Sequence, residues 1–132
     1  LKDCGGAVSG ESEAFQAVRM TFPSRFQEAE GSNPEELIAG AHATCYSMAL
    51  ANELEKAGAK PRRISTNATV TIRQQGDDIS IPSSHLVCVC EAEGITEAEF
   101  NKLAEAVKDA CPVSKLLAPG LESMTLEASF HG

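Results

Sequence analysis

Polar and apolar residues alternate in three segments of the chain, and this alternation is typical of a β-strand that buries one face. The segments are residues 64–73, 84–92 and 124–130. In the second, the apolar face consists of Leu86, Cys88, Cys90 and Ala92. Gln75-Gly76-Asp77-Asp78 separates the first two segments and predicts a turn. Nearer the start, Ala7–Ser9 and Glu13–Met20 are expected to form short strands.

A long helix is predicted from Pro34 to Ala57, before Gly58. Asn33 is suited to the N-cap, Pro34 to the first helical position, and Glu36 to completing a capping box. Small and apolar residues occupy most of the helix surface, so we expect a central, buried helix. Its stripe at spacings of three and four consists of Ile38, Ala41, His42, Cys45, Met48, Ala49 and Asn52.

A second helix is predicted to begin at the capping box Thr96-Glu97-Ala98-Glu99 and to end at Cys111, because Pro112 follows. Val113–Leu117 is expected to form a short helix with Pro112 in its first turn. Strands and helices together predict an α+β fold.

The composition indicates one globular domain of 132 residues, 42% hydrophobic and 23% charged. Eleven Lys and Arg residues against nineteen Asp and Glu residues give a net charge of −8. This balance disfavours binding to nucleic acid or to an anionic membrane through a charged face. No transmembrane run or signal peptide is recognised. Because the sequence starts at Leu1, we expect a short N-terminal segment to be missing.

The five cysteines are odd in number and irregularly spaced, which disfavours a secreted disulfide scaffold and favours a reducing, cytoplasmic compartment. Cys88 and Cys90 are expected to face away from His85, so a metal site there has poor geometry and core packing is favoured. Cys4 has no evident role. Cys45 and Cys111 could each be a buried core thiol.

Two helices covering one sheet could also bring Cys45 and Cys111 together. Neighbouring thiols can form a disulfide after one of them is oxidised to a sulfenic acid. The sequence alone does not place these two thiols side by side.

Several motifs resemble the OsmC/Ohr family of thiol-dependent peroxidases. They are Asn33–Ile38, Ala41–Leu50 around Cys45, and Cys111-Pro112-Val113-Ser114, with Ser24-Arg25-Phe26 and Glu93-Gly94-Ile95. The resemblance covers essentially the whole chain and favours the OsmC branch, because Ohr proteins usually have Tyr in place of His42 and an aromatic residue in place of Val113. It implies antiparallel sheets packed on two main helices, in an intertwined homodimer with active sites at the subunit interface.

The resemblance also implies residue roles. Cys45 resembles the peroxidatic cysteine, which becomes a sulfenic acid, and Cys111 the resolving cysteine, which joins it in an intramolecular disulfide. Arg25 resembles the arginine that stabilises the thiolate and orients the peroxide, and Glu35 the glutamate that holds this arginine. Taken alone, Arg25 is better explained as a solvated surface charge. Glu35 alone is explained equally well by a favourable charge in a first helical turn.

The expected chemistry of Cys45 requires a nearby cation. A thiol is mostly protonated at neutral pH, burial raises its pKa, and a position in mid-helix gains nothing from a helix N-terminus. Glu35 lies about 80° around the helix from Cys45 and nearly three turns earlier, at about 100° per residue. Glu35 therefore cannot touch Cys45, but it could hold an arginine between them.

The resemblance implies a peroxidase that reduces organic hydroperoxides, and hydrogen peroxide more weakly. Candidate walls of the substrate pocket are Phe22, Phe26, Tyr46 and Met48. No metal or bound cofactor is expected, but an external reductant is: a lipoyl dithiol, thioredoxin or a small thiol.

Two other functions stay open, a redox sensor without turnover and a domain that binds a small apolar ligand. His42 either tunes the thiolate or the mouth of the pocket, or is a packed, hydrogen-bonded core residue.

Overall fold

The computed structural model describes residues 5–132, and Cys4 lies outside them. The fold is α+β, as predicted. In chain order the elements are β1 (Gly5–Val8), β2 (Val18–Thr21), the 3-10 helix η1 (Pro23–Arg25), α1 (Pro34–Lys56), β3 (Lys60–Gln75), β4 (Asp78–Glu93), α2 (Glu97–Ala110), α3 (Pro112–Leu117), the 3-10 helix η2 (Ala118–Gly120) and β5 (Ser123–His131).

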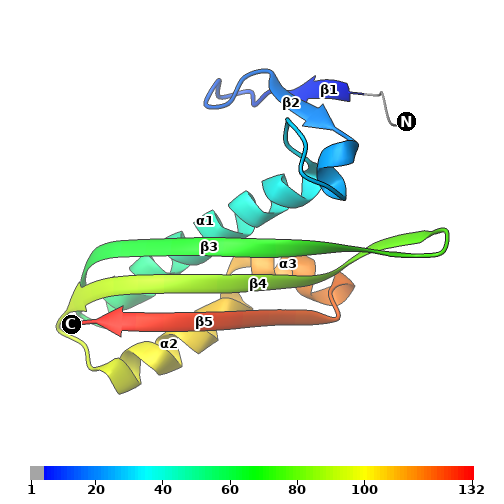
Figure 1. Ribbon diagram of the computed structural model, residues 1–132. Coiled ribbons are helices and arrows are strands. Elements are labelled where there is room, and N and C mark those ends of the chain that lie inside the picture. Colours follow the sequence, from blue (N-terminus) through cyan, green and yellow to red (C-terminus); the bar gives the residue numbers. More distant parts are fainter. Residues whose placement is uncertain (1–4) are drawn as a thin grey trace.

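The body of the molecule is a three-stranded sheet in the order β3-β4-β5, with the three α-helices on one face (Figure 1). β3 and β4 form an antiparallel hairpin. The expectation of antiparallel sheets is wrong for β5, which runs parallel to β4. Because α2 and α3 carry the chain back along the sheet before β5 begins, the last strand enters in the same direction as β4.

The core lies between this sheet and the helices. The predicted alternation in β4 is confirmed, because Leu86, Cys88, Cys90 and Ala92 are all buried, whereas Val87 and Val89 between them are exposed. The buried face of β4 packs with Tyr46, Leu50 and Leu54 of α1 and Phe100 of α2. These contacts fix α1 against the sheet along most of its length.

β1 and β2 form a separate antiparallel pair that stands away from the body, near the N-terminal end of α1 (Figure 1). We call residues 5–32 the arm. The strand predicted over Glu13–Met20 is reduced to Val18–Thr21 at its end. Glu13 and Ala17 have positive φ angles of 61° and 49°, which an extended strand does not allow, and the chain reverses there.

The start of α1 agrees with the prediction in part. The side chain of Asn33 accepts a hydrogen bond from the Glu36 amide at 2.8 Å, as an N-cap does. The capping box is not completed, because the Glu36 carboxylate accepts a hydrogen bond from the Ser32 hydroxyl instead. In α2 the predicted capping box between Thr96 and Glu99 is complete.

α1 buries a different stripe from the predicted one. The fully buried positions, four residues apart, are His42, Tyr46, Leu50 and Leu54, whereas Ala41 and Asn52 are exposed. Met48 is 69% exposed. The expectation of a helix buried all round is therefore wrong within one chain, because the sheet, α2 and α3 cover only one side of α1.

None of the helices in residues 5–132 is long and apolar enough to cross a membrane.

Candidate active site

Cys45 and Cys111 lie side by side although they are far apart in the sequence. Cys45 projects from the middle of α1, and Cys111 stands at the junction of α2 and α3. The two thiols are close enough to share a hydrogen bond. Cys45 is partly buried and Cys111 is 1% exposed, and both are free thiols. The structure thus brings together the two cysteines for which the sequence left proximity open.

The surroundings of Cys45 act on its pKa in opposite directions. Burial raises the pKa, a hydrogen bond from the backbone N–H of Val113 lowers it, and the contact with Cys111 raises it further, so the net shift is upward. The expectation that Cys45 gains nothing from a helix N-terminus holds for its own helix only. α3 begins at Pro112, and its first-turn amide points at the Cys45 sulfur.

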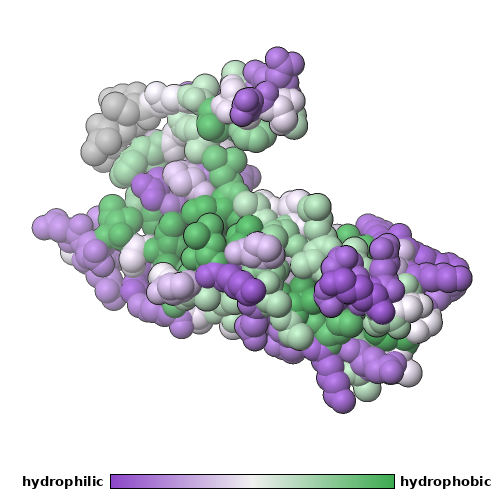
Figure 2. Space-filling model, turned by 180° about the vertical axis from the view of Figure 1, so that it is seen from behind, coloured by the Kyte–Doolittle hydropathy of each residue, from purple (hydrophilic) through white to green (hydrophobic). Residues whose placement is uncertain are grey.

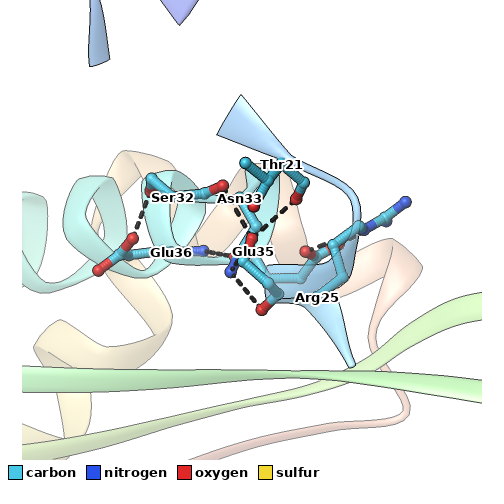
Figure 3. Close-up of polar contacts among 7 residues, drawn as sticks. Thr21, Arg25, Ser32, Asn33, Glu35 and Glu36 are labelled. Carbon is cyan, nitrogen blue, oxygen red and sulfur yellow. Dashed lines mark hydrogen bonds and ion pairs between the residues drawn. The ribbon is translucent and has the colours of Figure 1, made fainter. Parts of the chain in front are cut away.

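Arg25 and Glu35 form the second half of the candidate site. The Arg25 guanidinium donates to the two Glu35 carboxylate oxygens, from Nη2 at 2.6 Å and from Nε at 3.2 Å (Figure 3). Hydrogen bonding to Glu35 raises the pKa of Arg25, which stays charged. The Asn33 side chain donates to the Ser24 carbonyl at 3.0 Å and ties the turn around Arg25 to the start of α1.

The two halves do not meet within one chain. Arg25 and Glu35 line a groove beside β3, whereas Cys45 lines a different cavity. Glu35 precedes Cys45 by ten residues, about 15 Å along the helix axis at 1.5 Å per residue. Arg25 is not among the groups that shift the pKa of Cys45. The interpretation that Arg25 lies between Glu35 and Cys45 is therefore wrong for the single chain.

Cys45 borders a largely apolar cavity of about 910 Å³ between α1, the arm and Pro112. α1 contributes Leu37, Gly40, Ala41, Thr44, Met48 and Ala49, and the arm contributes Val8 and Phe15. Figure 2 shows hydrophobic residues gathered beneath the arm on the helix-covered side of the body. The i, i+3 and i+4 spacing of these α1 residues is the signal in the sequence that could have identified the cavity wall.

Of the four predicted pocket residues, only Met48 lines this cavity. Tyr46 is fully buried, and its hydroxyl donates to the Ala104 carbonyl at 3.2 Å, because it lies about 100° around the helix from Cys45 and faces the sheet. Phe22 and Phe26 pack against each other with ring centroids 5.5 Å apart, and Phe22 borders a different, small cavity beside Arg25.

His42 is fully buried between two hydroxyl groups. Its Nδ1 lies 2.7 Å from Oγ of Ser84 and its Nε2 lies 2.8 Å from Oγ of Ser114. Burial lowers the pKa of His42 and favours the neutral ring. This environment agrees with the interpretation of His42 as a packed, hydrogen-bonded core residue. Ser84 carries no local signal in the sequence, and Ser114 ends the motif Cys111-Pro112-Val113-Ser114, which by itself predicts no role for the serine.

The other cysteines belong to the core. Cys88 and Cys90 are fully buried, and burial raises the pKa of both, that of Cys90 to about 11. His85 lies on the opposite face of β4, as predicted, with Nδ1 2.5 Å from the Thr125 hydroxyl. Within the described residues, no three His, Cys, Asp or Glu side chains are grouped so that they could hold a metal ion.

Comparison with known proteins identifies relatives of the chain. The family model for OsmC-like proteins matches residues 27–124. Peroxiredoxin OsmC of Escherichia coli (strain K12) is 38% identical over 117 residues, which are 89% of this chain and 82% of the relative.

Solved structures agree in fold. An OsmC-like protein from Mycoplasma pneumoniae superposes with a TM-score of 0.73 at 14% identity, covering 98% of this chain and 96% of that one. The organic hydroperoxide resistance protein OhrB of Bacillus subtilis superposes with a TM-score of 0.69 at 18% identity, covering 96% of each chain. At such identities the superpositions establish the fold.

Proposed function

The chain belongs to the OsmC-like protein family, and we propose that it reduces organic hydroperoxides to alcohols with Cys45 as the attacking thiol. It is a cysteine-based peroxidase, as its identity to Peroxiredoxin OsmC over most of both chains indicates. The observation that carries the more specific proposal is the contact of Cys45 with Cys111 at the edge of an apolar cavity.

In the first step, the Cys45 thiolate attacks the terminal oxygen of the hydroperoxide. A sulfur–oxygen bond forms, the oxygen–oxygen bond breaks, and the alkoxide takes up a proton and leaves as the alcohol. Cys45 is now a sulfenic acid. The N–H of Val113 supports this step, because its hydrogen bond favours the thiolate over the thiol.

In the second step, the Cys111 sulfur attacks the Cys45 sulfenic sulfur. The disulfide forms, the sulfur–oxygen bond breaks, and hydroxide leaves as water after taking up a proton. The contact between the two thiols supports this assignment, because the resolving sulfur is already beside its target. A separate reductant then reopens the disulfide: a lipoyl dithiol, thioredoxin or a small thiol. Cys45 is the more accessible sulfur for its attack.

The shape and polarity of the cavity support organic hydroperoxides as substrates. Its largely apolar wall can bury an alkyl group, and each buried methylene contributes about 0.8 kcal/mol. Hydrogen peroxide has no such group and is reduced more weakly. The free thiols among the described residues are compatible with a reducing compartment, and we propose a cytoplasmic location.

We further propose that a homodimer completes the site. Burial and the neighbouring Cys111 raise the pKa of Cys45 despite the Val113 amide, and a fixed cation is the simplest means of stabilising its thiolate. Arg25 is held rigidly by Glu35, but away from Cys45 of its own chain. The exposed side of α1, with Leu37 and Met48, offers an apolar surface for a second copy, whose own Arg25 would then approach Cys45.

Steady-state consumption of an alkyl hydroperoxide in the presence of a dithiol tests this function. We expect continuous turnover that exceeds the enzyme concentration many times, and faster turnover with an alkyl hydroperoxide than with hydrogen peroxide. Oxidation of one equivalent followed by no turnover with any of the three reductant classes would contradict the enzyme and favour the redox sensor.

A further inference from the structure

A row of buried polar side chains leads from the sheet to Cys111. Ser84 of β4, His42 of α1 and Ser114 of α3 are all fully buried and hydrogen-bonded in that order. We call them the Ser84–His42–Ser114 chain. At its end, Oγ of Ser114 lies 3.3 Å from Sγ of Cys111, and the Ser114 amide donates to the same sulfur at 3.4 Å. The cycle described above assigns no role to these three residues.

The burial of Cys111 gives the Ser84–His42–Ser114 chain a possible chemical role. Cys111 must lose its proton to attack the Cys45 sulfenic acid, because the thiolate is the nucleophile. At 1% exposure, its thiol cannot pass the proton directly to bulk water. Apart from Cys45, the side chain that contacts its sulfur through a hydrogen bond in the described part of the chain is that of Ser114.

We propose that the Ser84–His42–Ser114 chain is the proton acceptor for the resolving thiol: Ser114 passes the proton of Cys111 to Nε2 of His42. This inference rests on the proposed function and adds a base to its second step. His42 and Ser114 are here positioning and proton-transfer residues for Cys111, and neither contacts the hydroperoxide.

The hydrogen bonds allow this transfer in one tautomer of His42. When Nδ1–H donates to Ser84, Nε2 is free to accept the Ser114 hydroxyl proton, and the Ser114 oxygen can accept the thiol proton of Cys111. Burial lowers the pKa of His42, so the ring is neutral and this nitrogen is available before the reaction. After the transfer, the Ser114 hydroxyl and amide both donate to the Cys111 thiolate.

The step is balanced. The thiol proton of Cys111 moves to Ser114 as the Ser114 hydroxyl proton moves to His42. The freed electron pair on the Cys111 sulfur forms the bond to the Cys45 sulfur, whose bond to oxygen breaks. Hydroxide leaves and becomes water with a proton from solvent in the cavity beside Cys45. The imidazolium of His42 returns its proton to solvent later, so the sum is one disulfide and one water.

Rapid mixing of the reduced protein with one equivalent of cumene hydroperoxide separates the two steps. Samples quenched with a sulfenic-acid trap and analysed by intact mass give the rate of Cys45 oxidation and the rate of disulfide formation. The variants are Ser114→Ala, which removes the hydroxyl, and Ser114→Thr, which keeps one. Ser47→Ala is the matched control. It removes a hydroxyl of α1 that donates a hydrogen bond to the Thr66 hydroxyl at 2.7 Å and does not belong to the Ser84–His42–Ser114 chain.

We expect Ser114→Ala to slow disulfide formation by about 100-fold, within the range for general acid–base catalysis, with Cys45 oxidation changed by less than about twofold. Ser114→Thr should recover most of the loss, and Ser47→Ala should leave both rates unchanged. Ser84→Ala is a second, independent test: it leaves the contacts of Cys111 intact but frees Nδ1 of His42, and should slow the same step.

Disulfide formation at the unsubstituted rate in Ser114→Ala would overturn the inference. An equal slowing of both steps, or Ser114→Thr no faster than Ser114→Ala, would also overturn it, since a disturbed structure would explain those results. Absence of sulfenic acid and disulfide in the unsubstituted protein would overturn the proposed function itself, and this inference with it.

Discussion

The guanidinium of Arg25 donates two hydrogen bonds, of 2.6 and 3.2 Å, to the carboxylate of Glu35. These bonds connect the 3-10 helix η1 to the first turn of α1. The pair is partly shielded from water, because Glu35 is only 5% exposed. It therefore has two expected roles: it stabilises the fold locally, and it holds a permanent positive charge in a fixed place.

Removal of the guanidinium should destabilise the protein. Arg25→Met leaves the Glu35 carboxylate buried without its partner, and we expect the free energy of unfolding to fall by about 1–3 kcal/mol. Arg19→Met is the matched control, because the Arg19–Glu30 pair is exposed and contributes about 0–1 kcal/mol. Urea denaturation of both variants measures the difference. Equal stability of the two variants would contradict the structural role of the pair.

The same substitution should change the pH dependence of peroxide reduction. Thiolate, not thiol, attacks the peroxide, and burial raises the pKa of Cys45, so the rate should rise with pH until the thiol is ionised. If Arg25 of a second copy stabilises the thiolate, Arg25→Met should move the midpoint of this rise to higher pH. Rates of Cys45 oxidation across pH 5–10 test this. An unchanged midpoint would contradict the proposal that Arg25 stabilises the Cys45 thiolate.

Substitution of the proposed nucleophile should abolish activity. Cys45→Ser leaves a hydroxyl that neither ionises near neutral pH nor takes up oxygen from a peroxide, so peroxide consumption should fall to background. Cys90→Ala is the control, since Cys90 is a buried core thiol on the sheet. Its consumption per folded molecule should be unchanged. Activity retained in Cys45→Ser would disprove the assignment.

Substitution of the proposed resolving thiol should stop the cycle after one turnover. Cys111→Ser retains Cys45, so it should consume about one equivalent of peroxide and then hold a sulfenic acid or a more oxidised form. Mass spectrometry with a sulfenic-acid trap detects these states. Continued turnover with a dithiol at the rate of the unsubstituted protein would show that Cys111 is dispensable.

A charge on the exposed side of α1 should separate the proposed dimer. Met48 is 69% exposed in the single chain, so Met48→Glu should leave the monomer folded but disfavour burial of this surface against a second copy. Leu116→Glu is the control, because Leu116 is 76% exposed and does not line the cavity beside Cys45. Light scattering reports the mass in solution. An unsubstituted protein that is monomeric, or Met48→Glu that remains dimeric, would contradict the proposal.

Local patterns in the sequence were sufficient for most helices and strands. Asn33 and Thr96 mark helix starts correctly because N-cap hydrogen bonds are formed within three residues. The direction of β5 and the course of residues 13–17 could not be predicted in this way, since they depend on how distant elements pack. The buried side of α1 was also ambiguous, because small apolar residues occur on both of its sides.

The candidate site shows the same division. The resemblance pointed to Cys45 and Cys111, and their contact appears only once α1 and α3 are packed together. It also pointed to Arg25 and Glu35, which form an ion pair but lie apart from the thiols. Ser84 could not be recognised, because its partner His42 is remote in the sequence and reaches it only through the packing of α1 on β4.

The central claim is that Cys45 and Cys111 act as one redox pair. The most direct test is intact-mass analysis and peptide mapping of the reduced protein after one equivalent of an alkyl hydroperoxide. We expect the loss of two hydrogen atoms and a peptide in which Cys45 is linked to Cys111. Thiols that remain unmodified in the folded protein, or a disulfide formed by another pair of cysteines, would contradict the claim.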